Sequence, residues 1–373
     1  MLCFEQQTQL KVRLDMRNAT IDIAKGIGIL SVVLCHNWIA YNNHELYRVI
    51  YSFHMPLFFF ISGIFFNPNS AFKPFVSNKF QGLLKPYFVV LLVLFLFNYF
   101  YNLVTKTAFD HTRYFFKLLY GSSSTLTWAP LWFLPHLFLV FIAGWFIHHY
   151  IFNRLPHNFY KVIFLSFMLL LGVLSLQTFW LAPIDPFGLN LILYNKNLLH
   201  GLPFDIDIML VTLPFFLFGA LSAKKMQSFQ YKSIYTALAL IIFIGLHYSY
   251  NYSIALHLRQ YDNLIVSTLQ IITGVYLVLS ISSLCTKYQI LSKVLSYLGQ
   301  ASLFILIFHY PIQRFIIFNM QYHLPQYKPQ VALAAMVISI VCSVILWQIT
   351  QNFNWLKMIF LPKKSLNVNV INT

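Results

Sequence analysis

The chain has 373 residues, of which 59% are hydrophobic and only 9% are charged. A water-soluble domain carries roughly 25% charged residues, so this composition excludes the soluble globular class and indicates a polytopic membrane protein. The formal net charge is +16, but the Lys and Arg residues are scattered in short segments between apolar runs. That distribution favours membrane topology and anionic headgroups over a nucleic-acid partner, which requires basic residues clustered on one surface.

Neither a cleaved leader nor a cysteine framework is expected. The polar segment 1–17 lacks an apolar core that ends in small residues, so the first hydrophobic helix should remain as a span. The cysteines are far apart, and no pair has the spacing of a metal or redox site: Cys3, Cys35, Cys285 and Cys342. We expect no metal centre and no permanently bound cofactor.

Apolar runs of about 20 residues, the length that crosses the hydrocarbon core, predict an all-α bundle of ten transmembrane helices. The fold is expected to be one membrane domain over 1–373, with short tails at 1–17 and 357–373. The predicted spans are 20–40, 49–66, 82–104, 131–151, 159–181, 207–222, 233–250, 263–284, 298–318 and 331–350.

The distribution of Lys and Arg predicts the orientation of this bundle. One side of the membrane receives 15 of the 25 basic residues, the other side receives 7, and Lys25, Lys85 and Arg314 fall within spans. Because cytoplasmic segments carry the excess of positive charge, both termini are predicted to be cytoplasmic.

The first two predicted spans contain four ionisable side chains among their apolar residues: Asp22, Lys25, His36 and His54. Each is costly in lipid, so an intramembrane ionisable residue indicates a functional site by default. At about 100° per residue, Asp22, Lys25 and His36 fall on one helical face, with Lys25 and His36 about 16 Å apart along the axis. A polar turn at 41–47 is expected to join the two spans.

A plainer interpretation of these residues stays open. Asp22 and Lys25 are spaced i, i+3 near a helix start, which also suits a surface ion pair. A single histidine on an apolar helix is more often a hydrogen-bonded core residue than a catalytic one. Gly26 and Gly28 flank Lys25 and allow a ligand or another backbone to approach closely there.

Two stretches of this region form a signature, Asp22-Ile-Ala-Lys-Gly-Ile-Gly-Ile-Leu-Ser-Val-Val-Leu-Cys-His36 and Phe53-His-Met-Pro-Leu-Phe-Phe-Phe-Ile-Ser-Gly63. They resemble the acyltransferase 3 family, integral-membrane acyltransferases that modify hydroxyl groups of extracytoplasmic sugars. In that family a basic residue, ten intervening residues and a histidine mark the first helix, and Lys25 and His36 match this spacing. Lys stands where many members carry Arg, and Lys lacks the bidentate fork of Arg.

The resemblance implies a cytoplasmic co-substrate, acetyl-CoA or another acyl-CoA. Its phosphates require cations, for which Lys25 and Lys85 are candidates, with Asp22 as the partner of Lys25. The separation of Lys25 and His36 is about the reach of a pantetheine arm. His36 is the candidate general base for the acceptor hydroxyl, and a transient acyl-imidazole stays open. His54 is a candidate for orienting the acceptor, although a hydrogen bond to a helix end suits it equally.

Two further stretches are similar to the family. Trp128-Ala-Pro-Leu-Trp-Phe-Leu-Pro135 contains Trp132, and Gly299-Gln-Ala-Ser-Leu-Phe-Ile-Leu-Ile-Phe-His-Tyr-Pro311 contains Ser302 and His309 on one helical face. These three residues are candidates for lining a cavity. The remaining basic residues of interest are interpreted as membrane anchors or interfacial groups: Lys79, His136, His148, His149 and His157.

Together these features predict an O-acetyltransferase of the inner membrane. It would transfer acetyl from cytoplasmic acetyl-CoA to a hydroxyl of a cell-surface sugar or lipid-linked glycan, in a cavity lined by helices one, two and nine. The alternative is a secondary transporter or flippase for a glycan, which ten spans, buried charges and a span interrupted by Pro214 also suit. Transporters usually carry paired repeats, and none is evident in this sequence.

Overall fold

The computed structural model describes residues 18–106, 110–177, 201–323 and 328–362. The predicted tail at 1–17, the end of the predicted span 159–181 and most of the predicted tail at 357–373 lie outside these ranges. The described chain is helical apart from a hairpin of two short strands, in which Ile254 pairs with Tyr261 and Ala255 with Gln260.

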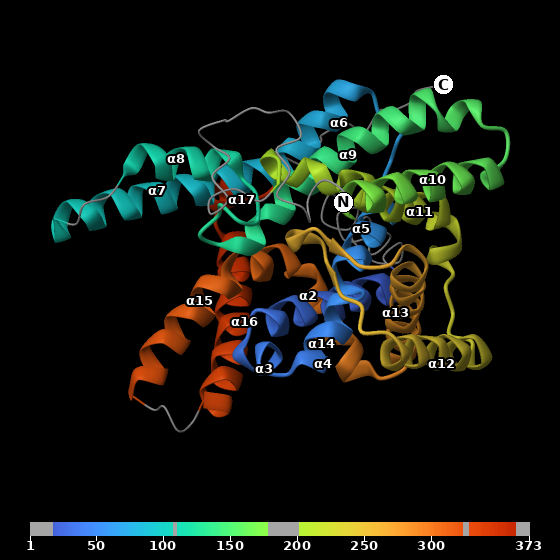
Figure 1. Ribbon diagram of the computed structural model, residues 1–373. Helices are drawn as coiled ribbons and strands as arrows, with labels where there is room; N and C mark the ends of the chain where they lie inside the picture. Colours follow the sequence, from blue (N-terminus) through green and yellow to red (C-terminus); the bar gives the residue numbers. More distant parts are fainter. Residues whose placement is uncertain (1–17, 107–109, 178–200, 324–327, 363–373) are drawn as a thin grey trace, which may run out of the picture.

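Figure 1 labels the main elements in chain order. They are α2 (Ala19–Cys35), α3 (Trp38–Tyr41), α4 (His44–Tyr51), α5 (His54–Ile64), α6 (Phe72–Lys79), the π-helical turn η1 (Phe80–Leu84), α7 (Lys85–Thr105), α8 (His111–Tyr120), η2 (Ala129–Trp132), α9 (Phe133–Tyr150), η3 (Phe152–Arg154), α10 (Asn158–Ser175), η5 (Pro203–Ile208), α11 (Met209–Gln227), α12 (Ser233–Ser249), β1 (Ile254–Ala255), η6 (Leu256–Leu258), β2 (Gln260–Tyr261), α13 (Leu264–Cys285), α14 (Gln289–Gln300), α15 (Ser302–His323), α16 (Lys328–Asn352) and α17 (Asn354–Phe360).

Within the described ranges, seven helical segments are long and apolar enough to cross a membrane. The prediction of an all-α membrane protein is confirmed, and each of these segments overlaps one of the ten predicted spans. The segments are Phe72–Thr105, Ala129–Arg154, Asn158–Ser175, Pro203–Gln227, Leu264–Cys285, Ser302–Met320 and Lys328–Asn352.

The other three predicted spans contain shorter helices. The helices α2 and α12 have 17 residues each, and α5 has only 11. At 1.5 Å per residue an 11-residue helix covers about 16 Å, roughly half of the hydrocarbon core. The continuous spans predicted at 20–40 and 49–66 are therefore wrong in detail, because α2 ends at Cys35 and α5 begins only at His54.

The polar turn predicted at 41–47 is also partly wrong, because residues 44–51 form the amphipathic helix α4. Glu45 and Arg48 make an i, i+3 ion pair across one turn of this helix, with 3.1 Å between Oε1 and Nη1. Arg48 Nη2 also donates to the carbonyl oxygen of His247 at 3.1 Å. These contacts tether α4 to the end of α12.

Close backbone contacts fix α2 against α14. A Cβ atom on Gly26 would lie 2.1 Å from the carbonyl oxygen of Leu295, and one on Gly299 would lie 2.0 Å from that of Asp22. Only glycine permits helices to approach this closely. The glycine beside Lys25 therefore serves helix packing.

The same kind of contact joins α5 to α11. A Cβ atom on Gly63 would lie 1.8 Å from the carbonyl oxygen of Phe216, and one on Gly219 would lie 2.0 Å from that of Phe60. Gly63, the last residue of the second stretch of the signature, therefore serves helix packing. Through the glycine contacts of α2 with α14 and of α5 with α11, α2 and α5 form the closely packed centre of the fold.

Longer helices surround this centre. Helix α2 packs against α13, α14 and α15, and α5 packs against α11 (Figure 1). Helices α15 and α16 form one antiparallel pair, and α12 and α13 form another. Helix α7 and its neighbour α8 project from the rest of the molecule, at the left of Figure 1.

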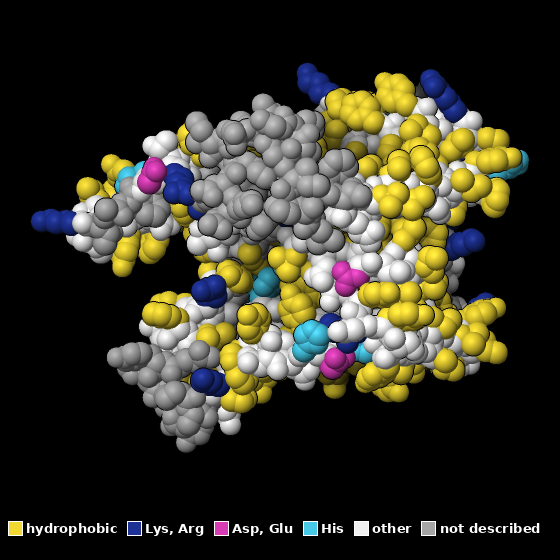
Figure 2. All heavy atoms as spheres, viewed as in Figure 1, with side chains coloured by type: hydrophobic (Ala, Val, Ile, Leu, Met, Phe, Trp, Pro, Cys, Tyr) yellow, Lys and Arg dark blue, Asp and Glu magenta, His cyan; other side chains and the backbone are white. Residues whose placement is uncertain are grey.

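The outer surface is apolar, as contact with lipid requires. Figure 2 shows hydrophobic side chains over the side that carries α10, α11 and α12, with few charged groups among them. Phe97 on α7, Ile241 on α12 and Val337 on α16 are each more than half exposed. A soluble protein rarely exposes so extensive an apolar surface.

Candidate functional site

The predicted catalytic histidine lies where α2 ends. His36 leaves the helical conformation at φ −94°, ψ 12°, and Asn37 begins α3 by accepting a hydrogen bond from the backbone N–H of Ile39 at 3.0 Å. The Asn37 amide group donates to Gln313 Oε1 at 2.6 Å and to the Ala332 carbonyl oxygen at 2.8 Å. These buried bonds to α15 and α16 fix the helix break and therefore the position of His36.

His36 faces two aromatic side chains of α15. The ring centroids are 5.5 Å apart for His36 and His309, and 5.4 Å apart for His36 and Tyr310. His309 is fully buried, and its Nδ1 donates to the Ile305 carbonyl oxygen at 2.6 Å. Its Nε2 is buried without a hydrogen-bond partner among the described residues. A buried nitrogen of this kind offers a lone pair to a hydroxyl group.

His54 approaches from the junction of α4 and α5. Its Nδ1 donates to the carbonyl oxygen of Ile50 at 2.9 Å, which is the helix-end bond of the alternative interpretation. Its ring lies 4.7 Å from that of Tyr51, and it is within electrostatic range of His36. Histidines from α2, α5 and α15 thus gather at one end of α2. Within the described ranges, no group of three or more His, Cys, Asp or Glu is arranged to hold a metal ion.

A cavity of about 310 Å³ lies along the same face of α2. Helices α2, α5, α9 and α15 and the turn η1 enclose it, and most of its lining is apolar. Lys25, Ile29 and Val32 line it from α2, and Ser302 and Leu306 line it from α15.

Two ammonium groups lie over aromatic rings of this lining. Lys25 Nζ is 4.1 Å from the ring centroid of Phe65 and 3.7 Å from Asp22 Oδ1. Lys79 Nζ is 3.5 Å from the ring centroid of Phe141. Phe65 and Phe141 both line the cavity. Two ammonium groups therefore lie beside an otherwise apolar space, and one of them is paired with a carboxylate.

The cavity and the histidine cluster follow the same helix faces. Val32 lines the cavity and lies four residues before His36, and Leu306 lines it and lies three residues before His309. Residues spaced i, i+3 or i, i+4 share a helical face, about one turn apart. The two histidines therefore lie one turn beyond the last cavity-lining residues of α2 and α15.

Two of the predicted site residues lie elsewhere. Lys85 Nζ donates to the carbonyl oxygens of Met358 and Leu361 at 2.8 and 2.6 Å, where it caps the end of α17. Trp132 is buried, with its ring 5.6 Å from that of His136, and it is not part of the cavity lining.

The interpretation of His136 as an interfacial residue is wrong. Its side chain is fully buried in α9, and its two ring nitrogens lie 3.1 Å from the Phe204 carbonyl oxygen and 2.9 Å from Thr212 Oγ1. These two bonds join α9 to η5 and α11. His136 is a structural histidine that satisfies both of its nitrogens.

From the sequence, Lys79 was interpreted as a membrane anchor and was not assigned to the site. Lys79 is the last residue of α6, and η1, a turn of π-helix, separates it from Lys85. The i→i+5 pattern of a π-helix changes the angle between successive side chains. Of the two lysines, Lys79 lies over a ring of the cavity lining, whereas Lys85 binds carbonyl oxygens at the end of α17.

A comparison with protein families places these features in a known group. The family described as Acyltransferase domain (Acyl_transf_3) matches residues 18–348, nearly the whole chain. No curated protein and no solved structure gives a match to this chain. The matched region includes the cavity, both lysines beside it and the histidine cluster. The chain therefore belongs to the acyltransferase 3 family and is a membrane acyltransferase.

Proposed function

We propose that this protein transfers an acyl group, acetyl in the first instance, from cytoplasmic acyl-CoA to a hydroxyl of an extracytoplasmic sugar or lipid-linked glycan. One observation carries the proposal. The cavity lies beside the ammonium groups of Lys25 and Lys79, and His36 and His309 lie one helical turn beyond Val32 and Leu306, its last lining residues on α2 and α15. The order from the lysines through the apolar lining to the histidines is the order of groups in an acyl-CoA, from the charged nucleotide through the pantetheine arm to the thioester.

The lysines suit the charged end of the donor. An ammonium group binds phosphate as a point charge, and it does so more strongly where an apolar wall excludes water. The apolar lining suits the pantetheine arm, and Ser302 supplies one of the few hydroxyl groups in that lining. The donor would therefore bind with its nucleotide beside Lys25 and Lys79 and its thioester towards His36.

The reaction follows from the histidine cluster. His36 accepts the proton of the acceptor hydroxyl as its oxygen attacks the thioester carbonyl carbon, so that a C–O bond forms. The C–S bond then breaks, the electron pair leaves with the sulfur of CoA, and the proton held by His36 returns to that thiolate. The products are the ester and free CoA. The unpartnered Nε2 of His309 is available to accept a hydrogen bond from a second hydroxyl of the acceptor.

The test uses membranes from a host that makes the acceptor glycan, with acetyl-CoA labelled in the acetyl group. Wild-type protein is expected to move label into saponifiable ester on the glycan and to release CoA in equal amount. His36→Ala is expected to lower this transfer by about 100-fold or more, the range for loss of a general base. The exposed histidine variant His157→Ala is the control and should transfer at the wild-type rate.

The same experiment separates acyl transfer from transport. A transporter moves glycan across the membrane without consuming acetyl-CoA, so it gives no labelled ester. Absence of label from the wild-type reaction, or full transfer by His36→Ala, would refute the proposed function.

A further inference from the structure

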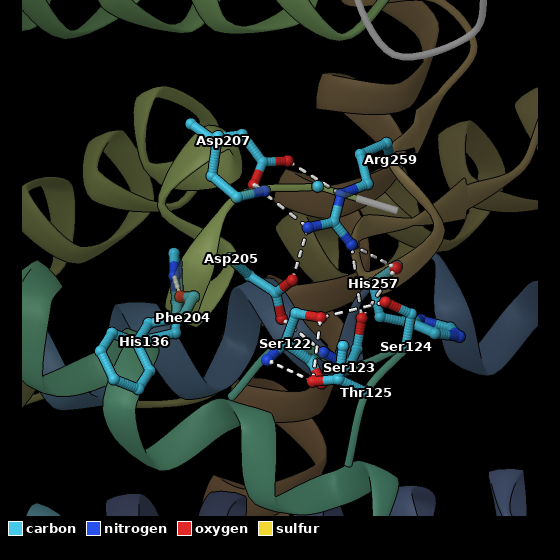
Figure 3. Close-up of polar contacts among 12 residues, drawn as sticks. Ser122, Ser123, Ser124, Thr125, His136, Phe204, Asp205, Asp207, His257 and Arg259 are labelled. Atoms are coloured by element: carbon cyan, nitrogen blue, oxygen red, sulfur yellow. Dashed lines mark hydrogen bonds and ion pairs between the residues drawn. The ribbon is translucent and has the colours of Figure 1, made fainter. Parts of the chain in front are cut away.

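A buried ion network lies near the histidine cluster and is not used by the reaction described above. The Arg259 guanidinium binds two carboxylates: Nη2 is 2.5 Å from Asp205 Oδ1, and Nε is 2.8 Å from Asp207 Oδ2. All three side chains are at least 97% buried. Figure 3 shows the guanidinium between the two carboxylates. Charges are buried in this way only when several hydrogen bonds satisfy them.

The network holds a short segment of backbone in place. Arg259 Nη1 donates to the carbonyl oxygen of His257 at 2.8 Å, and Ser123 Oγ donates to the same oxygen at 3.0 Å. The backbone N–H of Ser123 donates to Asp205 Oδ2 at 3.0 Å. Arg259 itself has a left-handed backbone, with φ 59°. The turn between β1 and β2 is thereby locked to η5 and to the segment before η2.

His257 extends from this locked turn towards the histidine cluster. The ring centroid of His257 lies 5.6 Å from that of Tyr51, and the Tyr51 ring also lies 4.7 Å from the ring of His54. It is also within electrostatic range of His36. Figure 3 shows its imidazole on the side of the network away from Asp207. A fourth histidine, from a separate part of the chain, thus lies beside Tyr51 and near the histidine cluster.

The protonation state of His257 suits a hydroxyl ligand. Burial, together with the charge of Arg259, lowers the pKa of His257 to about 4. At neutral pH its ring therefore has one N–H donor and one nitrogen acceptor, as a hydroxyl group has one donor and two lone pairs. The side chain is partly exposed, so a ligand can reach it.

We infer that His257 is an acceptor-binding residue, which hydrogen-bonds a second hydroxyl of the sugar whose neighbouring hydroxyl His36 deprotonates. Arg259 is a positioning residue that acts through the His257 carbonyl oxygen. The inference rests on the proposed function and assigns the acceptor side of the same site. The acceptor class that it implies is a polyhydroxylated molecule with hydroxyls close enough to contact both histidines.

The test measures donor and acceptor functions separately in the membrane assay with labelled acetyl-CoA. His257→Gln and His257→Asn are expected to lower maximal labelling of the glycan by about tenfold or more, the loss of one good hydrogen bond. The KM for acetyl-CoA should stay within about twofold of wild type, because the donor site is untouched. His157→Gln is the matched control and should behave as wild type in both measurements.

The role of Arg259 is tested by comparing the labelling of the glycan by Arg259→Lys with that by Arg259→Met. Arg259→Lys keeps the charge but cannot bridge two carboxylates and a carbonyl oxygen, so its labelling should fall between those of wild type and Arg259→Met. The KM for acetyl-CoA should again be unchanged. A change in donor KM that equals the loss in labelling would contradict the positioning role.

Each outcome decides the question. Labelling by His257→Gln at the level of His157→Gln overturns the inference and leaves the proposed function intact. Failure of both amide variants to fold, measured by thermal unfolding of the purified protein, also overturns it, because His257 would then be structural. Failure of the wild-type protein to label the glycan rejects the proposed function itself.

Discussion

The imidazole rings of His36 and His309 face each other at 5.5 Å, although one residue ends α2 and the other lies in the middle of α15. The bonds from Asn37 to Gln313 and Ala332 maintain this arrangement from the side of the helix break. The pair joins the first described helix of the fold to one of the last. Under the proposed function, acyl transfer takes place at this pair, one helical turn beyond the cavity.

The first prediction concerns the two nitrogens of His309. An Asn at this position can reproduce the bond of Nδ1 to the Ile305 carbonyl oxygen, but it cannot reach the position of Nε2, whereas a Gln reaches further. If Nε2 contacts the acceptor, His309→Asn should lose about tenfold or more of the transfer rate, and His309→Gln should retain more of it. Initial rates of glycan labelling measure the difference, and equal rates for the two variants would exclude a role for Nε2.

The second prediction concerns donor affinity. Lys25→Gln and Lys79→Gln remove charges beside the cavity and should each raise the KM for acetyl-CoA by about tenfold, with a smaller change in the maximal rate. Lys25→Arg should remain close to wild type. Raising the ionic strength should weaken donor binding by the wild type more than by the variants, because salt screens the lost attraction.

Lys85→Gln is the control for this pair. Its ammonium group caps α17 through two carbonyl oxygens, so its loss should lower thermal stability and leave the donor KM unchanged. A raised donor KM for Lys85→Gln, with normal values for Lys79→Gln, would reverse the assignment of the two lysines.

The third prediction concerns helix packing. Gly219→Ala places a methyl group against the backbone of Phe60 and should destabilise the protein by about 1–3 kcal/mol, seen as a lower midpoint of thermal unfolding. Gly245→Ala, on the exposed side of α12, meets no atom within 4 Å and should be neutral or stabilising by up to about 1 kcal/mol. A stable Gly219→Ala protein would show that α5 and α11 separate without cost.

The fourth prediction concerns pH. The pKa of His257 is about 4 in the folded protein because of burial and the charge of Arg259, below the ordinary value of 6.5. A folded-state pKa below the unfolded one favours folding when the ring is neutral, so this contribution is present above about pH 6.5 and is lost as the pH falls towards 4. Lowering the pH from 7 to 5 should therefore destabilise wild type more than His257→Gln. Parallel unfolding midpoints at both pH values would contradict this.

The sequence was sufficient to predict what depends on regular helical spacing. Lys25 and His36 were expected on one face of the first helix, and the cavity follows that face from Lys25 through Ile29 to Val32, one turn before His36. Long apolar runs predicted the seven segments that are able to span a membrane. The break inside the first span was missed, because Asn37 caps the short helix α3 through a bond that a hydropathy scan does not detect. The break inside the second span lies between α4 and α5, at Ser52 and Phe53, and has no such cap.

Contacts between distant parts of the chain were beyond that reasoning. Asp205 and Asp207 lie in η5 and Arg259 follows η6, about 50 residues later, and only the fold brings their charges together. His257 is therefore isolated in the sequence and clustered in space. The directions of Lys79 and Lys85 relative to each other were also beyond that reasoning, since an α-helical projection does not apply across the π-helical turn η1. Pro86, two residues after η1, is the sequence signal that indicates a change of helical spacing in this region.

The shortness of α5 has a consequence for how a charged co-substrate and a polar acceptor reach each other. A helix of 11 residues covers only about half of the hydrocarbon core, so other parts of the protein must span the remaining half. Under the proposed reaction, neither the nucleotide nor the glycan has to cross a lipid-thick barrier. Only a small, uncharged acyl fragment makes the passage, and the electrical work of moving phosphate charges through the bilayer is avoided.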